Sequence, residues 1–405
     1  MRPMEGIRVL EVAQFTFVPA AGAVMADWGA EVIKVEHPAT GDGQRGLRQI
    51  GHLRLPADHN PGFEHPNRGK RSVGIDIATA EGRELLLDLV ATSDVFLTNF
   101  LPAARRSLGI EVEDVRARNP DIIYVRGTAL GDRGPEREHG GYDMTGFWCR
   151  GSVASSITPT DVTGIVPQPP AFGDSMGGMT IAGGVAAALL ARERSGRPSE
   201  VDVSLLGVGM WAMGLPIAAT ARAGQPWTAP PTGLSAAPTN PLAGIYETAD
   251  GRLLSLLMLQ GFRYWADFCR HIDRADLVAD ARFASAELLA EHAAEATAIL
   301  REVLAQRTLA EWTERFATLD GQWAPVQDSI EVAADGQARA NGYVIPVVAD
   351  DGVAFDLVAS PVQFDHSIPE LHPAPAFAAD TEQVLLDLGL EWERIISLKA
   401  AGAIS

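Results

Sequence analysis

The sequence has little cysteine, no clustered histidine and no excess of positive charge. Only Cys149 and Cys269 occur in 405 residues, which predicts no disulfide framework and makes a reducing cytoplasm the expected location. The nine histidines fall at no metal-binding spacing, so we expect no metal site. The net charge of −19 argues against nucleic acid or an anionic membrane as partner, because both need a basic footprint.

Long apolar runs and a dinucleotide-binding fingerprint are also missing. No unbroken apolar run reaches membrane length, and residues 1–5 show no charged-then-apolar leader, so we expect no membrane partner. The turn after the first predicted strand, residues 13–18, lacks the Gly-x-Gly-x-x-Gly pattern that seats a pyrophosphate on a helix end. NAD or FAD binding of the usual kind is therefore not expected.

Strands and helices alternate along the first half of the chain, which predicts a parallel α/β sheet. We expect the strands at residues 7–12, 30–35, 72–77, 94–97, 122–125 and 199–204. The predicted fold class is α/β: a Rossmann-like large domain plus a smaller α+β domain, joined by long linkers. The boundaries that we expect are 1–205 for the first part of the large domain, 206–242 for a linker, 243–325 for the small domain, 326–343 for a second linker, and 344–405 for a C-terminal segment that returns to the large domain, beginning with antiparallel strands.

The segment Gly173-Asp174-Ser175 places an acid and a hydroxyl where an alanine-rich helix is predicted to begin. Free N–H groups and the helix dipole at this end favour an ionised carboxylate, which is the form that attacks an acyl carbon. A plain helix N-cap would explain the same residues. The pattern Gly173-x-Ser175-x-Gly177 also matches a hydrolase nucleophile elbow, but the three prolines in residues 166–172 argue against the strand that an elbow needs.

Several separated blocks carry a resemblance to a known family over nearly the whole chain. The sequence resembles the class III CoA-transferases, also called the CaiB/BaiF or formyl-CoA transferase-like family. The blocks are Gly6–Glu11, Trp28–Glu36, Asn67–Val73, Asn99–Pro102, Asn119–Tyr124, Gly173–Ser175, Arg307–Trp312 and Ala324–Val326.

The resemblance implies a function and a site. Asp174 matches the catalytic aspartate, which forms an acyl-aspartyl anhydride and then an aspartyl-CoA thioester. The implied substrates are an acyl-CoA and a carboxylic acid acceptor, with no permanently bound cofactor. Two chains are implied to interlock as a homodimer, with each active site between the large domain of one and the small domain of the other. The positions that match CoA contacts are Thr16, Phe17, His37, Ile75, Asp76, Ile77, Ala78, Asn99, Phe100, Leu101, Arg106, Gly140, Gly141, Tyr142 and Asp143.

The sequence departs from the family where relatives often place basic residues for the CoA phosphates, at Ala78, Ser107 and Gly140. The nearest basic candidates are Lys70, Arg71, Arg105 and Arg106.

Two alternative functions stay open. The α-methylacyl-CoA racemases share the fold, but this chain has Tyr142 where their Gly-His-Asp motif has histidine, and only His139 nearby as a substitute base. A non-catalytic acyl-CoA-binding subunit would keep the fold without the chemistry.

Overall fold

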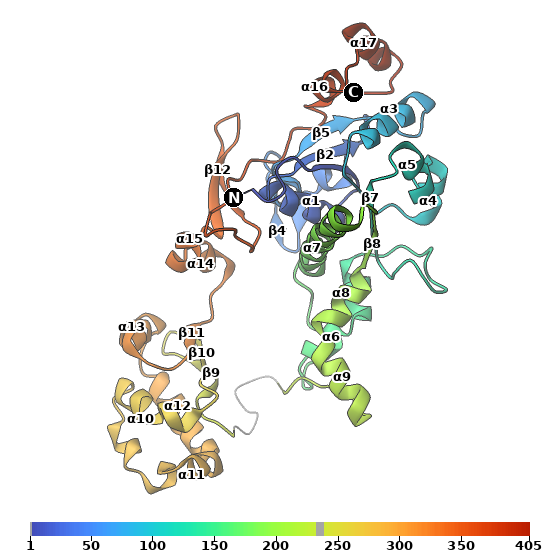
Figure 1. Cartoon of the computed structure of the whole chain (residues 1–405). Helices are drawn as coiled ribbons and strands as arrows, with labels where there is room; N and C mark the ends of the chain where they lie inside the picture. The colour runs from blue at the N-terminus through green and yellow to red at the C-terminus, as the bar shows by residue number, and fades with distance from the viewer. Residues whose placement is uncertain (1, 232–238) are drawn as a thin grey trace. The chain divides into compact units, whose positions relative to one another are not determined.

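The computed structural model describes residues 2–231 and 239–405, which form two compact units (Figure 1). Unit 1 contains residues 2–157, Ile165–Trp227 and Gly336–Ser405. Unit 2 contains Thr158–Gly164 and the described part of residues 228–335. The predicted linker 206–242 includes residues 232–238, which lie outside the described residues.

A six-stranded parallel sheet is the centre of unit 1. Its strand order is β5-β2-β1-β6-β7-β8, and every neighbouring pair runs parallel. Each strand overlaps one of the predicted segments, so the predicted parallel sheet is confirmed. The bounds are β1 (Arg8–Val12), β2 (Glu31–Glu36), β5 (Arg71–Gly74), β6 (Val95–Thr98), β7 (Ile123–Thr128) and β8 (Glu200–Ser204).

Alternate residues of these strands point to opposite faces of the sheet, and each face is covered by helices. Val9 and Val125 belong to the core beneath α1 (Phe17–Asp27) and α7 (Phe172–Ser195). Leu10 and Tyr124 belong to the core on the other face. That face is covered by α3 (Ala80–Ala91), α5 (Val112–Arg118), α16 (Thr381–Asp387) and α17 (Trp392–Ala400).

Helix α7 is, among the described residues, the one single helix long and apolar enough to cross a membrane. It packs along α1 and against β7 and β8, as a core helix of an α/β unit does. Gly177 and Gly178 make this contact close, because a Cβ at Gly177 would lie 2.3 Å from the ring of Phe17 and one at Gly178 would lie 2.5 Å from Ala20 Cβ. A second candidate is the pair α8 (Leu205–Ala212) and α9 (Gly214–Ala223), which is bent by 71°.

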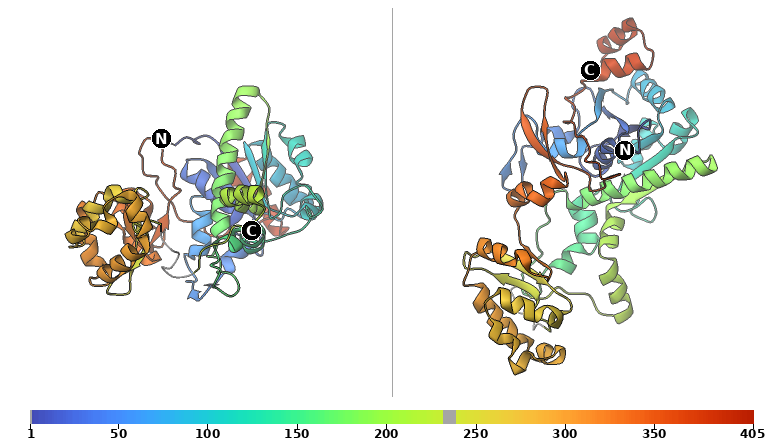
Figure 2. Two further views of the ribbon diagram at one scale, coloured as in Figure 1. Left: turned by 90° about the horizontal axis from the view of Figure 1, so that it is seen from below. Right: turned by 60° about the vertical axis from the view of Figure 1, so that its left-hand side comes forward.

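The C-terminal segment lies beside the sheet that the N-terminal half builds (Figures 1 and 2). Strands β12 (Val344–Val348) and β13 (Ala354–Val358) form the predicted antiparallel hairpin. Further on, Asp380 accepts the Ser72 N–H at 2.8 Å, and Ile404 forms a β-bridge with Ile75. Strand β5 is therefore covered by the end of the same chain.

Two segments predicted as linkers contain helices. Helix α8 buries Leu205 and Val208, and α9 follows it directly. The second segment contains α14 (Ser329–Ala334) and α15 (Gly336–Ala340). Glycine and proline lie in and beside these segments and weaken the helical pattern of the sequence, so their short helices were not predicted.

Unit 2 combines a small antiparallel sheet with helices around an aromatic core. The sheet order is β11-β10-β9, with β9 (Ala243–Glu247), β10 (Leu253–Leu257) and β11 (Trp323–Pro325). Trp265, Phe268, Trp312 and Phe316 are buried in its core. The main helices are α10 (Gly261–His271), α11 (Ala286–Glu291), α12 (Ala293–Leu304) and α13 (Leu309–Arg315). The shorter elements of the chain include β3 (Gln49–Ile50), β4 (Leu53–Arg54), α2 (Pro61–Asn67), α4 (Pro102–Leu108), the π-helical turn η2 (Met144–Arg150) and α6 (Val153–Ile157).

Candidate active site

Two cavities open at the carboxyl ends of the parallel strands in unit 1, where open α/β sheets bind their ligands. The larger has a volume of about 740 Å³ and contains Asp174 in its wall. The smaller has a volume of about 180 Å³. Gln14, Phe100 and Leu108 line both, so the two cavities are adjacent.

The cavities meet where the strand order reverses, between β1 and β6. The loop after β1 and the loop after β6 are tied there by a reciprocal pair of hydrogen bonds. The Gln14 N–H donates to Asn99 Oδ1 at 3.1 Å, and Asn99 Nδ2 donates to the Gln14 carbonyl at 2.7 Å. Asn99 therefore holds the two loops in register at the edge of the site.

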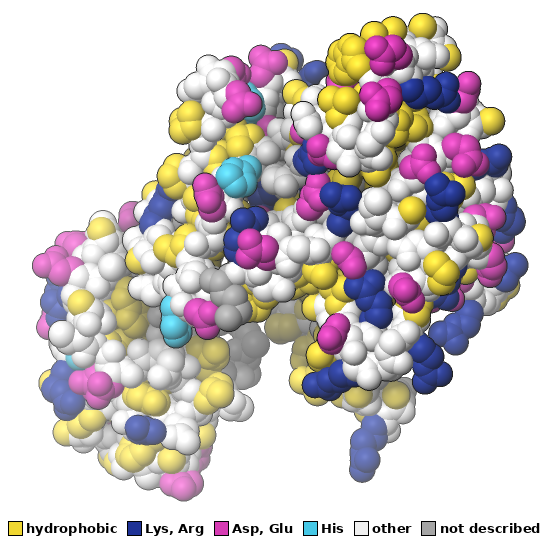
Figure 3. All heavy atoms as spheres, turned by 45° about the horizontal axis from the view of Figure 1, so that its top comes forward, with side chains coloured by type: hydrophobic (Ala, Val, Ile, Leu, Met, Phe, Trp, Pro, Cys, Tyr) yellow, Lys and Arg dark blue, Asp and Glu magenta, His cyan; other side chains and the backbone are white. Residues whose placement is uncertain are grey.

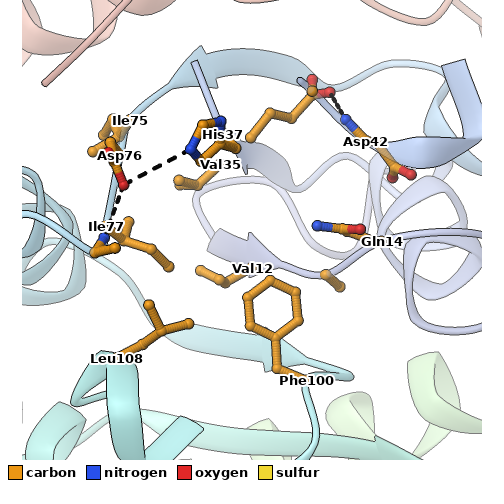
Figure 4. Close-up of a pocket in the computed structure, with 14 residues that line it drawn as sticks. Val12, Gln14, Val35, His37, Asp42, Ile75, Asp76, Ile77, Phe100 and Leu108 are labelled. Atoms are coloured by element: carbon orange, nitrogen blue, oxygen red, sulfur yellow. Dashed lines mark hydrogen bonds and ion pairs between the residues drawn. The ribbon is translucent and has the colours of Figure 1, made fainter. Parts of the chain in front are cut away.

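The smaller cavity is mostly apolar (Figure 4). Val12, Val35 and Ile77 point into it together with Phe100 and Leu108. Asp76 lies at its rim, where it accepts the Ala78 N–H at 3.1 Å, and its Oδ1 is 4.0 Å from His37 Nε2. The smaller cavity therefore combines an apolar lining with a polar rim.

Asp174 lies in the first turn of α7 and lines the larger cavity. Burial, and after it the charge of Asp143, raise the pKa of its carboxyl to about 7. The residue before the helix is Ala171, so Asp174 is not the N-cap itself. Within the described residues no strand leads into α7, which removes the structural basis for an elbow at Ser175.

A buried ionic cluster supports the loop that follows β1. Lys34 and Lys70 both donate to Glu11 at 2.7–3.0 Å, and Lys34 also lies 2.8 Å from Asp42. Burial lowers the pKa of Lys70 to about 7, against the opposing effect of Glu11. Asp42 in turn accepts the N–H of Phe15, whose φ of 63° is in the left-handed region. The cluster thus holds a strained turn that presents Phe15 to the larger cavity.

The structure brings most of the predicted CoA-contact residues together. The smaller cavity is lined by His37, Ile75, Asp76, Ile77, Ala78 and Phe100. The larger is lined by Phe17, Asn99, Phe100, Leu101, Gly140, Gly141, Tyr142 and Asp143. Thr16 lines neither: it is 6% exposed, and its hydroxyl accepts a hydrogen bond from Gln44.

The four basic candidates lie outside the walls of both cavities and are paired with carboxylates. Lys70 is buried against Glu11, and Arg106 pairs with Glu138 at 3.0 Å. Arg71 pairs with Glu31, and Arg105 pairs with Glu111. On the face seen in Figure 3, basic side chains are interspersed with acidic ones.

Sequence reasoning missed several residues of the larger cavity, above all Arg137, and considered His139 only as a substitute base. Both are exposed and belong to the loop after β7, beside the predicted Gly140–Asp143 segment. Gln14 and residues 127–129 were also missed. The signal that could have found them is their place directly after predicted strands, because the carboxyl ends of parallel strands share one edge of a sheet.

A metal-binding cluster is not found in the part of the chain that the structure describes: no group of three or more His, Cys, Asp or Glu side chains is suitably placed. The groups that the cavities offer are instead the carboxyls of Asp143 and Asp174, the side chains of Arg137 and His139, and apolar walls.

Several known proteins are similar to this chain in sequence and in fold. The (R)-2-hydroxy-4-methylpentanoate CoA-transferase of Clostridioides difficile is 32% identical over 399 residues, which cover 98% of each chain. The cinnamoyl-CoA:phenyllactate CoA-transferase of Clostridium sporogenes is 30% identical over 398 residues, 97% of this chain and 95% of that one. A crystal structure of a CaiB/BaiF family protein from Brucella suis has a TM-score of 0.80 at 26% identity and covers 95% of this chain and 99% of that chain. The sequence model of CoA-transferase family III matches residues 4–381. The chain therefore belongs to CoA-transferase family III and is a CoA-transferase.

Proposed function

We propose that the protein transfers CoA between carboxylic acids through covalent intermediates on Asp174. The observation that carries this proposal is the position of Asp174: a mostly buried carboxyl in the first turn of α7, in the wall of a cavity that continues toward a second, apolar one. A carboxylate of raised basicity is a stronger nucleophile once ionised, and partial burial limits hydrolysis of the activated intermediates.

The proposed reaction balances in four steps. The Asp174 carboxylate attacks the thioester carbon of the donor, the C–S bond breaks, and CoA leaves as a thiolate. The thiolate attacks the aspartyl carbon of the resulting anhydride and releases the donor acid as its carboxylate. The acceptor carboxylate then attacks the aspartyl-CoA thioester, which expels the thiolate and forms a second anhydride. Attack of the thiolate on the acceptor's acyl carbon yields the new acyl-CoA and regenerates Asp174.

We place CoA along the two cavities. The apolar lining and polar rim of the smaller cavity suit the adenine ring, and the thioester end would then reach Asp174 in the larger one. Arg137 and His139 replace the predicted basic residues as candidates for the phosphates, because both line the cavity while Arg106 does not.

The mechanism is tested by trapping. Protein is incubated with acyl-CoA thioesters that include cinnamoyl-CoA and 2-hydroxy-4-methylpentanoyl-CoA, and hydroxylamine is added during turnover. We expect a hydroxamate at Asp174 in the peptide mass spectrum. Asp174→Ala should abolish transfer and Ser175→Ala should lose much less. The opposite ranking of these two variants would refute Asp174 as nucleophile.

Racemisation remains a second candidate for one reason: His139 lines the cavity that contains Asp174. A racemase would wash deuterium from heavy water into the position next to the thioester without an acceptor acid. We expect no such uptake with 2-hydroxy-4-methylpentanoyl-CoA, because transfer through Asp174 does not touch that C–H bond.

We also propose that the protein acts as a homodimer in the cytoplasm. The support within unit 1 is a pair of exposed apolar side chains on α8 and α9, Trp211 at 85% and Leu215 at 82% exposure. Mixing tagged and untagged protein tests the interlocked form, since interlocked chains should exchange no faster than they unfold.

A further inference from the structure

The N-terminus of α7 has no cap from its own sequence. Ala171 stands at the N-cap position with φ of 56° and makes no side-chain hydrogen bond to the helix. The first N–H groups of a helix have no partner within the helix and need acceptors from elsewhere.

Asp143 supplies that acceptor from a different element. It precedes the turn η2, thirty residues before the helix, and its Oδ2 accepts the Gly173 N–H at 3.0 Å. Burial raises the pKa of Asp143. The Gln168 side chain and the backbone N–H groups of Asp174 and Gly173 lower it, but their effect is smaller and the pKa stays raised. The Asp143 carboxylate therefore occupies the site where a helix normally receives its own N-cap side chain.

Gly173 makes this approach sterically possible. A Cβ at Gly173 would lie 2.3 Å from Asp143 Oδ1 and 2.2 Å from the Cγ of Phe147. No side chain can occupy that space, so Asp143 packs closely against the first turn of α7. Asp143 itself is only 8% exposed.

Asp174 has the opposite environment. In residues 2–231 and 239–405, no hydrogen bond to its carboxyl group is found, and the charge that acts on it is that of Asp143. Because the Gly173 N–H is already bonded to Asp143, the Asp174 side chain is not needed to cap it. It faces the larger cavity instead.

The other charged groups on the elements packed against α7 are neutralised, exposed or absent. On β7, Arg126 is paired with Asp202 of β8, and on α1, Asp27 is paired with Arg68. Helix α8 carries no charged residue. The remaining titratable groups of the cavity are Tyr142 and the exposed Arg137 and His139 on the loop before Asp143.

We propose that Asp143 is a positioning residue for the transfer reaction: its carboxylate caps α7 from outside and holds the Asp174 side chain toward the cavity with a negative charge beside it. This inference rests on the proposed role of Asp174 as nucleophile. Attack on a thioester removes the charge of Asp174, so repulsion between the two carboxylates is relieved as the anhydride forms. Asp143 thus disfavours the resting carboxylate relative to the acylated state.

Asp143→Asn tests the proposal without a substrate. The amide keeps an oxygen for the Gly173 N–H and nearly the same volume, but it has no charge. A water-soluble carbodiimide with glycine methyl ester labels protonated carboxyls, and peptide mass spectrometry measures labelling of Asp174 against pH. In the wild type, half-maximal labelling is expected near pH 7. In Asp143→Asn it should move to lower pH by about one unit, the usual size of one neighbouring charge.

The matched control is Asp88→Asn, which removes one carboxylate from an exposed ion pair with Arg118 far along the sequence from the site. It should leave the labelling curve of Asp174 unchanged. With an active acyl-CoA, the acid limb of the kcat/KM profile should shift in the same direction in Asp143→Asn alone.

An unchanged labelling midpoint in folded Asp143→Asn would overturn the proposal, while the trapping result on Asp174 would still decide the nucleophile separately. If Asp143→Asn does not fold, as judged by circular dichroism, Asp143→Ser provides a neutral cap for the same measurement. Loss of the fold in both variants would also overturn it, because Asp143 would then serve folding and not Asp174.

Discussion

Asp174→Asn should make the protein more stable, and the gain should depend on pH. The pKa of Asp174 is raised to about 7 in the folded protein, from 3.8 for an ordinary aspartate. A carboxyl whose folded pKa is raised binds its proton more tightly in the folded state. This tighter proton binding stabilises the folded protein fully below pH 4. The stabilisation is lost as pH rises from 4 to 7. Asparagine resembles the protonated form at every pH and escapes this loss.

The size of the effect follows from the shift in pKa. A pKa difference of about three units corresponds to about 4 kcal/mol in the free energy of unfolding. This value is a ceiling because the cavity admits water. We expect Asp174→Asn to raise the free energy of unfolding by about 2 kcal/mol at pH 8. For a unit of this size that is a rise in Tm of about 4 °C. Thermal unfolding followed by circular dichroism at pH 4, 5, 6, 7 and 8 measures the difference between wild type and Asp174→Asn. Asp88→Asn is the control, with an expected change within about 0.5 kcal/mol at every pH. A variant that is less stable than wild type at pH 8, or a difference that does not grow between pH 4 and 7, would refute the reasoning.

Three further predictions concern other parts of unit 1. Gly178→Ala should destabilise the protein by about 1–3 kcal/mol because its Cβ would meet Ala20. Gly183→Ala lies on the same helix with open space around it and should stabilise the protein by about 0.5–1 kcal/mol. Urea unfolding of the two variants measures both changes. Glu11→Gln should cost about 3–5 kcal/mol in the same assay, since it leaves Lys34 and Lys70 buried without their shared carboxylate, and a loss below 1 kcal/mol would contradict the buried cluster. Leu108→Trp should raise the KM for an acyl-CoA several-fold with kcat little changed, because Leu108 lines both cavities; an unchanged KM would place CoA elsewhere.

The alternation of strands and helices was readable from the sequence because parallel strands, buried on both faces, form short apolar runs such as Val95–Leu97. The antiparallel hairpin near residue 350 was readable from a different local pattern, the alternation typical of antiparallel strands over residues 344–364. The short helices α8, α9, α14 and α15 were not, because residue composition outweighed their weak helical pattern.

Asp174 could be selected from the sequence because its signal is local: an acidic residue between glycine and serine at the start of a long helix. That local signal also misplaced the helix start, since the structure begins α7 at Phe172 and leaves the cap position to Ala171. The capping group, Asp143, comes from thirty residues away, where no local pattern indicates the contact.

By itself the sequence determined the order of strands and helices, the family, and the residue most suited to be the nucleophile. Only the tertiary structure decided which polar groups meet. From the sequence alone, Arg106 and Lys70 are as good candidates for a phosphate contact as Arg137. In the structure both are paired with carboxylates outside the cavity walls, whereas Arg137 lines the larger cavity. Asn99 ties two loops that are 85 residues apart, and Asp143 sets the surroundings of Asp174. The physical reason is that charge pairing, burial and pKa depend on distances between chain segments, and these are defined only when the sheet has brought the ends of its strands together.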